Sequence, residues 1–163
     1  IRDRHMGEQE QFDDITLLTL RRRKENELDC HRLSQKALLP KLPRFRNFVA
    51  EVCQAWKVDK RISENLQLAV DEVCSNLILH GYKGSKEGDI VLSLNKRKDC
   101  VQVQIEDGCI TFDPSFFDPP VLGEKIEDRK IGGLGVYMVR ELVDELSYKS
   151  KKGRTGLILG IKN

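Results

Sequence analysis

A carboxylate and a carboxamide stand four residues apart as Glu72 and Asn76. On a helix, that step places both side chains on one face. The carboxylate could accept a proton, and the amide oxygen is a hard ligand suited to magnesium. On spacing alone, a solvent-exposed polar pair on an amphipathic helix is the favoured interpretation. Asp71 is a competing carboxylate, but it points about 100° away from Glu72 around the helix.

A second carboxylate, Asp107, follows a strand-like stretch and precedes Gly108. A carboxylate at the end of a strand can accept hydrogen bonds from an exocyclic amino group such as that of adenine. An Asp-Gly pair is also typical of an ordinary turn. The order of this feature relative to the others is therefore more informative than the pair itself.

A glycine-rich segment, Gly132-Gly133-Leu134-Gly135, precedes a helical pattern. Residues without side chains let backbone N–H groups approach phosphate oxygens, and a helix N-terminus favours negative charge. The segment matches neither the P-loop nor the Rossmann fingerprint, since no Lys-Ser/Thr follows it and no strand directly precedes it. A flexible connection would explain the glycines equally well.

Hydrophobic periodicity predicts the elements that position these residues. Apolar residues at three- and four-residue steps predict one helix after Pro43 and a second that is capped by Ser63 and ends at Gly81. A third helix follows Gly135. Strands are predicted around 27–33 and at 15–20, 90–94, 101–105, 146–149 and 155–161. These helices and hairpins predict an α+β sandwich and argue against a parallel, doubly wound sheet.

Length and composition predict one domain, or one domain with a short appendage, in the cytoplasm. The chain has 163 residues, of which 39% are hydrophobic and 33% charged, and its net charge of +2 is too small to indicate nucleic acid as a partner. No apolar stretch approaches the roughly 20 residues of a membrane-spanning helix. The five cysteines include no C-x-x-C pair, and the three histidines form no zinc-like cluster. These features favour a reducing compartment without contact to a membrane.

In this order and at these spacings, the three features resemble the motifs of the Bergerat-fold ATPases, the superfamily of gyrase, chaperone, histidine kinase and mismatch-repair ATPase domains. Glu72 and Asn76 resemble the N box, Asp107 begins the first glycine box, and Gly132 to Gly135 resemble the second. A closer resemblance, over residues 40–163, is to the RsbW-type anti-sigma-factor serine kinases. It is carried by Leu79-His80-Gly81-Tyr82, by Phe112-Asp113-Pro114 and by the thirteen residues from Gly132 to Asp144.

The resemblance implies a two-layer sandwich in which helices cover one face of a mixed, mainly antiparallel sheet, the Bergerat ATPase fold. It also implies ATP and Mg²⁺ as ligands. The implied roles are general base for Glu72, magnesium ligand for Asn76, adenine recognition for Asp107 and phosphate binding for Gly132, Gly133, Leu134, Gly135 and Thr155. The chain departs from the family at two places, with Cys109 in the first glycine box and Ile131 where some relatives carry an arginine.

The N-terminal part suggests a second resemblance. The segment Gln11 to Leu18 is similar to the end of a SpoIIE-like, PPM-type serine phosphatase domain. We therefore expect residues 1–24 to be a phosphatase remnant with a basic linker, and residues 25–163 to be the histidine-kinase-like ATPase domain. Only the last phosphatase strand is present, so we expect no phosphatase activity from this chain.

The leading functional hypothesis is a magnesium- and ATP-dependent protein serine kinase that acts on a STAS-type anti-anti-sigma protein. A sigma factor is an alternative partner for the same surface, and symmetric dimers are common among relatives. The second hypothesis is a non-catalytic nucleotide-binding module that sequesters a partner within a larger phosphatase–kinase regulator. Glu72 favours the enzyme, since a pure binder needs no base beside the phosphates. A histidine kinase is disfavoured because His31 lies in a strand-like stretch.

Overall fold

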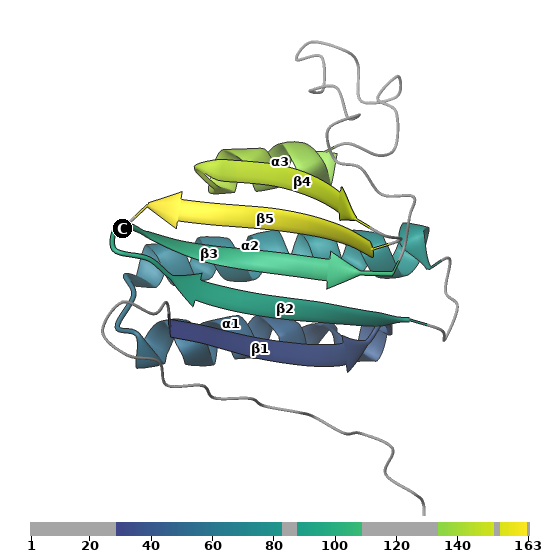
Figure 1. Ribbon diagram of the computed structural model, residues 1–163, viewed down its shortest axis with the longest axis horizontal. Helices are drawn as coiled ribbons and strands as arrows, with labels where there is room; N and C mark the ends of the chain where they lie inside the picture. The colour runs from purple at the N-terminus through teal and green to yellow at the C-terminus, as the bar shows by residue number, and fades with distance from the viewer. Residues whose placement is uncertain (1–28, 83–87, 109–133, 152–153, 163) are drawn as a thin grey trace, which may run out of the picture.

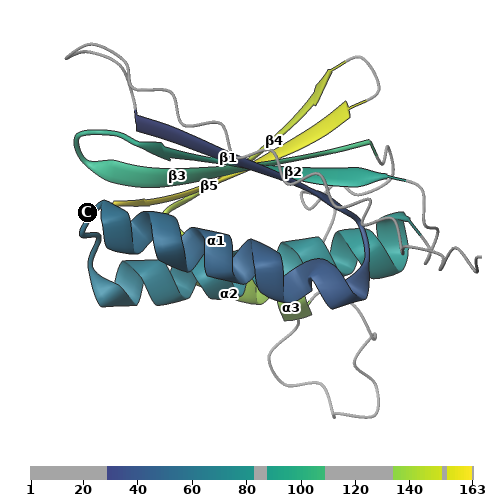
Figure 2. The same ribbon diagram turned by 90° about the horizontal axis from the view of Figure 1, so that it is seen from below.

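The computed structural model describes residues 29–82, 88–108, 134–151 and 154–162. Within them, five strands form one sheet, and three α-helices lie together on one of its faces (Figures 1 and 2). The elements in chain order are β1 (Asp29–Lys36), the short 3₁₀ turn η1 (Leu39–Lys41), α1 (Leu42–Ala55), α2 (Lys60–Asn76), the π-helical turn η2 (Leu77–Gly81), β2 (Asp89–Lys96), β3 (Cys100–Asp107), α3 (Leu134–Leu142), β4 (Glu145–Lys151) and β5 (Arg154–Lys162).

The strand order is β1-β2-β3-β5-β4, and each of the four pairings is antiparallel. The predicted α+β class and the one-sided helical layer are thus confirmed. The predicted mixed sheet is not observed among the described strands. β4 runs parallel to β3, but β5 inserts between them, so no two parallel strands become neighbours.

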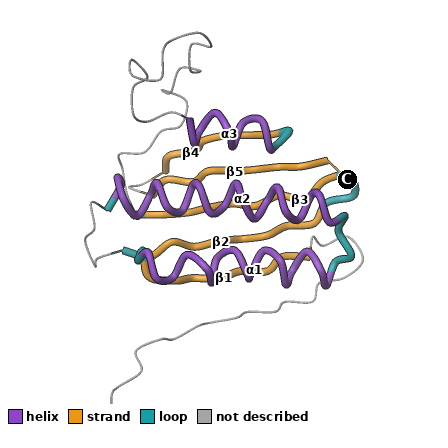
Figure 3. Tube along the Cα trace, turned by 180° about the vertical axis from the view of Figure 1, so that it is seen from behind, coloured by secondary structure: helices purple, strands orange, loops and turns teal. Residues whose placement is uncertain are grey.

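The first helix follows the predicted pattern. Pro43 lies in the first turn of α1, where its missing N–H has no intrahelical partner to lose. The buried residues of α1 are Phe45, Phe48, Val49, Val52 and Cys53. Figure 3 shows α1 over β1 and β2, with α2 beside it and α3 beyond α2.

The second helix begins earlier than predicted. Asp59, not Ser63, is its N-cap, and the Asp59 carboxylate accepts a hydrogen bond of 2.8 Å from the backbone N–H of Arg61. Aspartate is among the strongest N-cap residues, so the helix starts at the first such residue. The Ser63 hydroxyl instead accepts a hydrogen bond of 3.1 Å from Gln67 on the next turn.

The helical backbone ends at Gly81, as predicted, but its last turn is π-helical. The backbone N–H of Tyr82 donates to the carbonyl of Leu77, five residues earlier, at 2.9 Å. π-helical turns widen a helix locally and often occur at functional sites. This turn begins directly after Asn76, so its wider geometry sets the direction of the chain from Asn76 to Tyr82.

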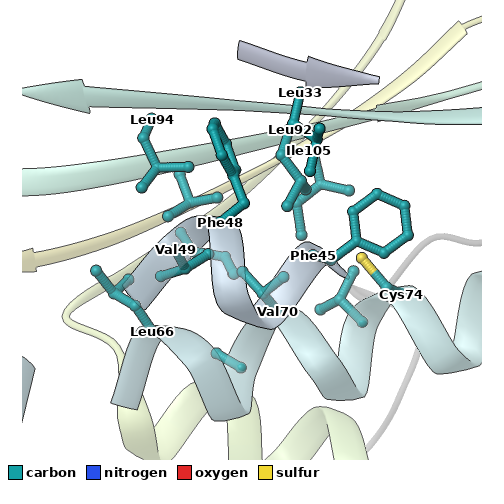
Figure 4. Packing of buried hydrophobic residues seen from close by; sticks show 14 of the residues in the cluster. Leu33, Phe45, Phe48, Val49, Leu66, Val70, Cys74, Leu92, Leu94 and Ile105 are labelled. Atoms are coloured by element: carbon teal, nitrogen blue, oxygen red, sulfur yellow. The ribbon is translucent and has the colours of Figure 1, made fainter. Parts of the chain in front are cut away.

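The core lies between the helices and the inner face of the sheet (Figure 4). Phe45 of α1 and Cys74 of α2 face Leu92 and Ile105 of the central strands. Alternate residues of β2 and β3, such as Ser93, Gln102 and Gln104, point to the opposite face. Among the described helices, none is sufficiently long and apolar to cross a membrane.

Most predicted strands are confirmed. The predicted central hairpin corresponds to β2 and β3, and the closing hairpin corresponds to β4 and β5. The strand expected around 27–33 is β1, which is described from Asp29 and extends to Lys36. The strand at 15–20 and the phosphatase-like segment lie outside the described residues.

Two leucines on α2 provide a test of this packing. Leu66 is fully buried, whereas Leu68 is 45% exposed on the same helix. We predict that Leu66→Ala lowers the free energy of unfolding by about 2–5 kcal/mol, because it leaves a cavity between α2 and the sheet. Leu68→Ala should change it by less than about 0.5 kcal/mol. Urea denaturation of both variants measures this, and equal losses would contradict the packing.

Candidate active site

The C-terminal ends of α2 and β3 and the N-terminal end of α3 lie on the same side of the molecule (Figures 1 and 3). Each of these ends carries one of the features predicted to do chemistry. Asn76 ends α2, Asp107 ends β3, and Gly135 is the second residue of α3. Segments far apart in the sequence are therefore brought together by the packing of α3 beside α2 and by the sheet.

Glu72 and Asn76 form a hydrogen-bonded pair on the last turns of α2. The Nδ2 atom of Asn76 donates to Oε1 of Glu72 at 2.8 Å, and both side chains are half-buried. A carboxylate can only accept, so the amide nitrogen must face Glu72. The amide oxygen of Asn76 consequently points away from the carboxylate, where it can serve as an oxygen ligand.

Gly135 packs directly against the Glu72 carboxylate. A Cβ atom built at Gly135 would overlap Oε1 of Glu72 and would lie 2.5 Å from its carboxyl carbon. A residue with a side chain fits there only if the Glu72 carboxylate or one of the two helices moves. The contact places the negative charge of Glu72 at the first turn of α3, where a helix dipole stabilises an anion.

Asp107 is a buried carboxylate, with 4% of its surface exposed. It pairs with Thr155 across β3 and β5, so the backbones of these two predicted site residues are neighbours. Burial, followed by the charges of Asp71 and Asp107, raises the pKa of the Cys74 thiol far above its usual range. Cys74 lies between Glu72 and Asn76 in α2.

Tyr82 joins these segments and was not singled out as a site residue from the sequence. Its hydroxyl accepts a hydrogen bond of 3.1 Å from the backbone N–H of Gly108 and donates one of 3.4 Å to the carbonyl of Asp89. Its ring lies against Gly88, which has a φ of 130° and no room for a Cβ. The only sequence signal was the place of Tyr82 at the end of the N-box-like segment.

The other predicted site residues are placed less completely. Leu134 is the first residue of α3, and Thr155 is placed through its backbone pairing. Gly132 and Gly133 lie outside the described residues, as do Cys109 and Ile131. The described part of the site therefore consists of the pair on α2, the start of α3 and the end of β3.

The donor set fits a magnesium ion that arrives with a nucleotide. Among the residues that the structure describes, no group of three or more His, Cys, Asp or Glu side chains could hold a metal by itself. The outward amide oxygen of Asn76 is a hard ligand of the kind that Mg²⁺ accepts, and Mg²⁺ usually completes its shell with phosphate oxygens and water.

Replacing Gly135 tests the close approach of α2 and α3. Alanine within a helix is usually more favourable than glycine by up to about 1 kcal/mol. We predict the opposite sign here, because the new Cβ would displace the Glu72 carboxylate. Gly135→Ala should lower both the free energy of unfolding and the affinity for ATP, as measured by denaturation and calorimetry.

A double-variant cycle separates this overlap from other effects. In a Glu72→Ala background, the overlap is gone, so adding Gly135→Ala should no longer destabilise the protein. A Gly135→Ala variant that is more stable than the parent and binds ATP equally well would contradict the contact.

Curated relatives are similar to part of this chain. The serine-protein kinase RsbW of Listeria innocua is 30% identical over 94 residues, which is 55% of this chain and 60% of that protein. RsbW of Bacillus subtilis is 30% identical over 99 residues, with 56% and 60% covered. The chain therefore spans less than two thirds of the length of these relatives.

A solved structure and a family description cover more of the chain. The crystal structure of the RsbU and RsbW domains of a Mycobacterium tuberculosis protein matches with a TM-score of 0.52 and 19% identity, over 80% of this chain and 32% of that one. The likeness concerns the fold. The family described as "Histidine kinase-like ATPase domain" matches residues 36–161, from the end of β1 into β5. The chain thus belongs to the histidine kinase-like ATPase domain family.

Proposed function

We propose that this chain is a protein serine kinase that binds ATP with Mg²⁺ between the end of α2, the start of α3 and the end of β3. The γ-phosphoryl group would pass to a serine hydroxyl of a protein partner. The observation that carries the proposal is the position of the Glu72 carboxylate, which is held by Asn76 and packed against Gly135. The RsbW relatives, each named a serine-protein kinase, support the same reaction.

Glu72 is the proposed general base. Its Oε1 atom accepts the hydrogen bond from Asn76, and this bond fixes the plane of the carboxylate on a rigid helix. The Oε2 atom is the proposed acceptor of the proton that the serine hydroxyl loses as its oxygen attacks the γ-phosphorus. Phosphoryl transfer depends mainly on positioning and on charge neutralisation, so an immobilised carboxylate is well suited to the role.

The remaining roles follow from the chemistry of each group. Asn76 would hold the magnesium ion through its amide oxygen. When bound, the ion would neutralise charge on the phosphates. Asp107 would accept a hydrogen bond from the adenine amino group and repel the carbonyl oxygen that guanine carries there. Backbone N–H groups at Gly132, Gly133, Leu134 and Gly135, together with Thr155, would bind phosphate oxygens.

The proposed substrate is a STAS-type anti-anti-sigma protein, with a sigma factor as the alternative partner. This choice is supported by the resemblance of residues 40–163 to RsbW-type kinases. We assign residues 25–163 to the kinase domain and residues 1–24 to a phosphatase remnant and linker. The cysteines in the described part of the chain are all free thiols, which favours the cytoplasm as the working compartment.

A non-catalytic nucleotide switch is the competing function. Such a module needs a nucleotide site but no proton acceptor beside the phosphates. The structure holds Glu72 in place from two sides, through Asn76 and through Gly135, which a binding module would not require. This arrangement favours the kinase.

Glu72→Gln separates catalysis from binding. The substitution keeps the shape of the side chain and removes its ability to accept a proton at neutral pH. We predict that ATP affinity stays within about threefold while phosphorylation of the purified STAS-type partner falls by about 10²–10⁴-fold, the usual contribution of a general base. Transfer from labelled ATP and a calorimetric titration measure the two quantities.

Asp71→Asn is the matched control, since it makes the same charge change one residue away on α2. The Oδ2 atom of Asp71 lies 3.9 Å from Nη1 of Arg46 in a partly exposed pair, so its loss should leave transfer unchanged. Undiminished phosphorylation by Glu72→Gln would remove Glu72 from the role of base. An equal loss in both variants would show that helix charge, and not the position of Glu72, controls the rate.

A further inference from the structure

The Tyr82 hydroxyl connects two parts of the site that the sequence separates by 26 residues. Tyr82 directly follows the π-helical turn that begins after Asn76, and its backbone N–H closes that turn by donating to the carbonyl of Leu77. The same residue then bonds the backbone of Gly108, which directly follows Asp107. The end of the helix that carries Asn76 and the end of the strand that carries Asp107 are therefore connected through one residue, Tyr82.

The position of the hydroxyl is set from several sides. The ring packs on Gly88, where any side chain would overlap it, and against the hydrophobic core. Gly88 is itself held, since its carbonyl accepts a hydrogen bond of 3.0 Å from the N–H of Ala37. The hydroxyl hydrogen is directed to the Asp89 carbonyl, so the oxygen lone pairs are available to the Gly108 N–H.

We propose that Tyr82 is a positioning residue for base recognition. Its hydroxyl holds the backbone at Asp107 and Gly108 so that the Asp107 carboxylate meets the amino group of adenine. The inference rests on the proposed function of this site as an ATP site. It assigns Tyr82 to selectivity for the base and not to phosphate binding. The reason is geometric, because the hydrogen bond goes to the residue beside Asp107 and not to α3.

The alternative is that Tyr82 only fills space. Its ring contacts the core and Gly88, and a phenylalanine would keep both contacts. Tyr82→Phe is therefore the informative change, since it removes the hydroxyl alone. A space-filling role predicts no change in nucleotide binding, whereas a positioning role predicts a loss that depends on the base.

The test compares three probes that share a triphosphate, namely ATP, GTP and inorganic tripolyphosphate, each titrated with Mg²⁺ into the full chain. We predict that Tyr82→Phe weakens ATP binding by about three- to tenfold, the effect of one hydrogen bond. Tripolyphosphate affinity should stay unchanged, and the ratio of ATP to GTP affinity should fall by a similar factor. Tyr148→Phe removes the same atom from β4, an edge strand, and should change none of these values.

Three outcomes would overturn the inference. Unchanged ATP affinity would show that Tyr82 only fills space. An equal loss for ATP and tripolyphosphate would show a general effect on the site and not on the base. If the unaltered chain binds tripolyphosphate but does not prefer ATP to GTP, base recognition at Asp107 fails while the phosphate site stands. The readout is binding, so a chain that binds ATP but transfers no phosphate would contradict the kinase proposal and leave this inference intact.

Discussion

The close approach of α2 and α3 is the constraint on which the rest of the site depends. Because Gly135 has no side chain, the Glu72 carboxylate can lie against the first turn of α3 while accepting a hydrogen bond from Asn76. The same approach brings the end of one helix and the start of another to one side of the sheet. A larger residue at position 135 would separate these groups, whatever the state of the core.

The sheet and the π-helical turn supply the second half of the arrangement. The antiparallel register carries β3 past the core and ends it at Asp107, opposite Thr155. The turn after Asn76 then directs Tyr82 to the backbone of Gly108, so that the helix end and the strand end are tied by a hydrogen bond. Both elements pack on buried apolar side chains that fix their positions, as the proposed phosphoryl transfer would require.

The features that were predicted correctly from sequence are those that depend on local periodicity. The apolar faces of α1 and α2 and the two hairpins follow from three-, four- and two-residue repeats. The features that were missed depend on competition between nearby residues for the same position, or on contacts between segments far apart in the sequence. Asp59, not Ser63, caps α2, and β5 lies between β3 and β4. The position of the Tyr82 ring depends on Gly88, whose positive φ no local pattern indicated. The pairing of Glu72 with Asn76 followed from helical spacing, but its contact with Gly135 did not.

The most direct measurement of the central claim is the footprint of a nucleotide on the chain. A titration of the isotope-labelled protein with Mg²⁺ and a non-hydrolysable ATP analogue, followed by NMR, reports which amide groups meet the ligand. We predict the largest shifts at the Asn76 side-chain amide and at the backbone amides of Gly108 and Gly135. Shifts confined to the opposite face of the sheet, at Ser93 and Gln102, would contradict the site described above.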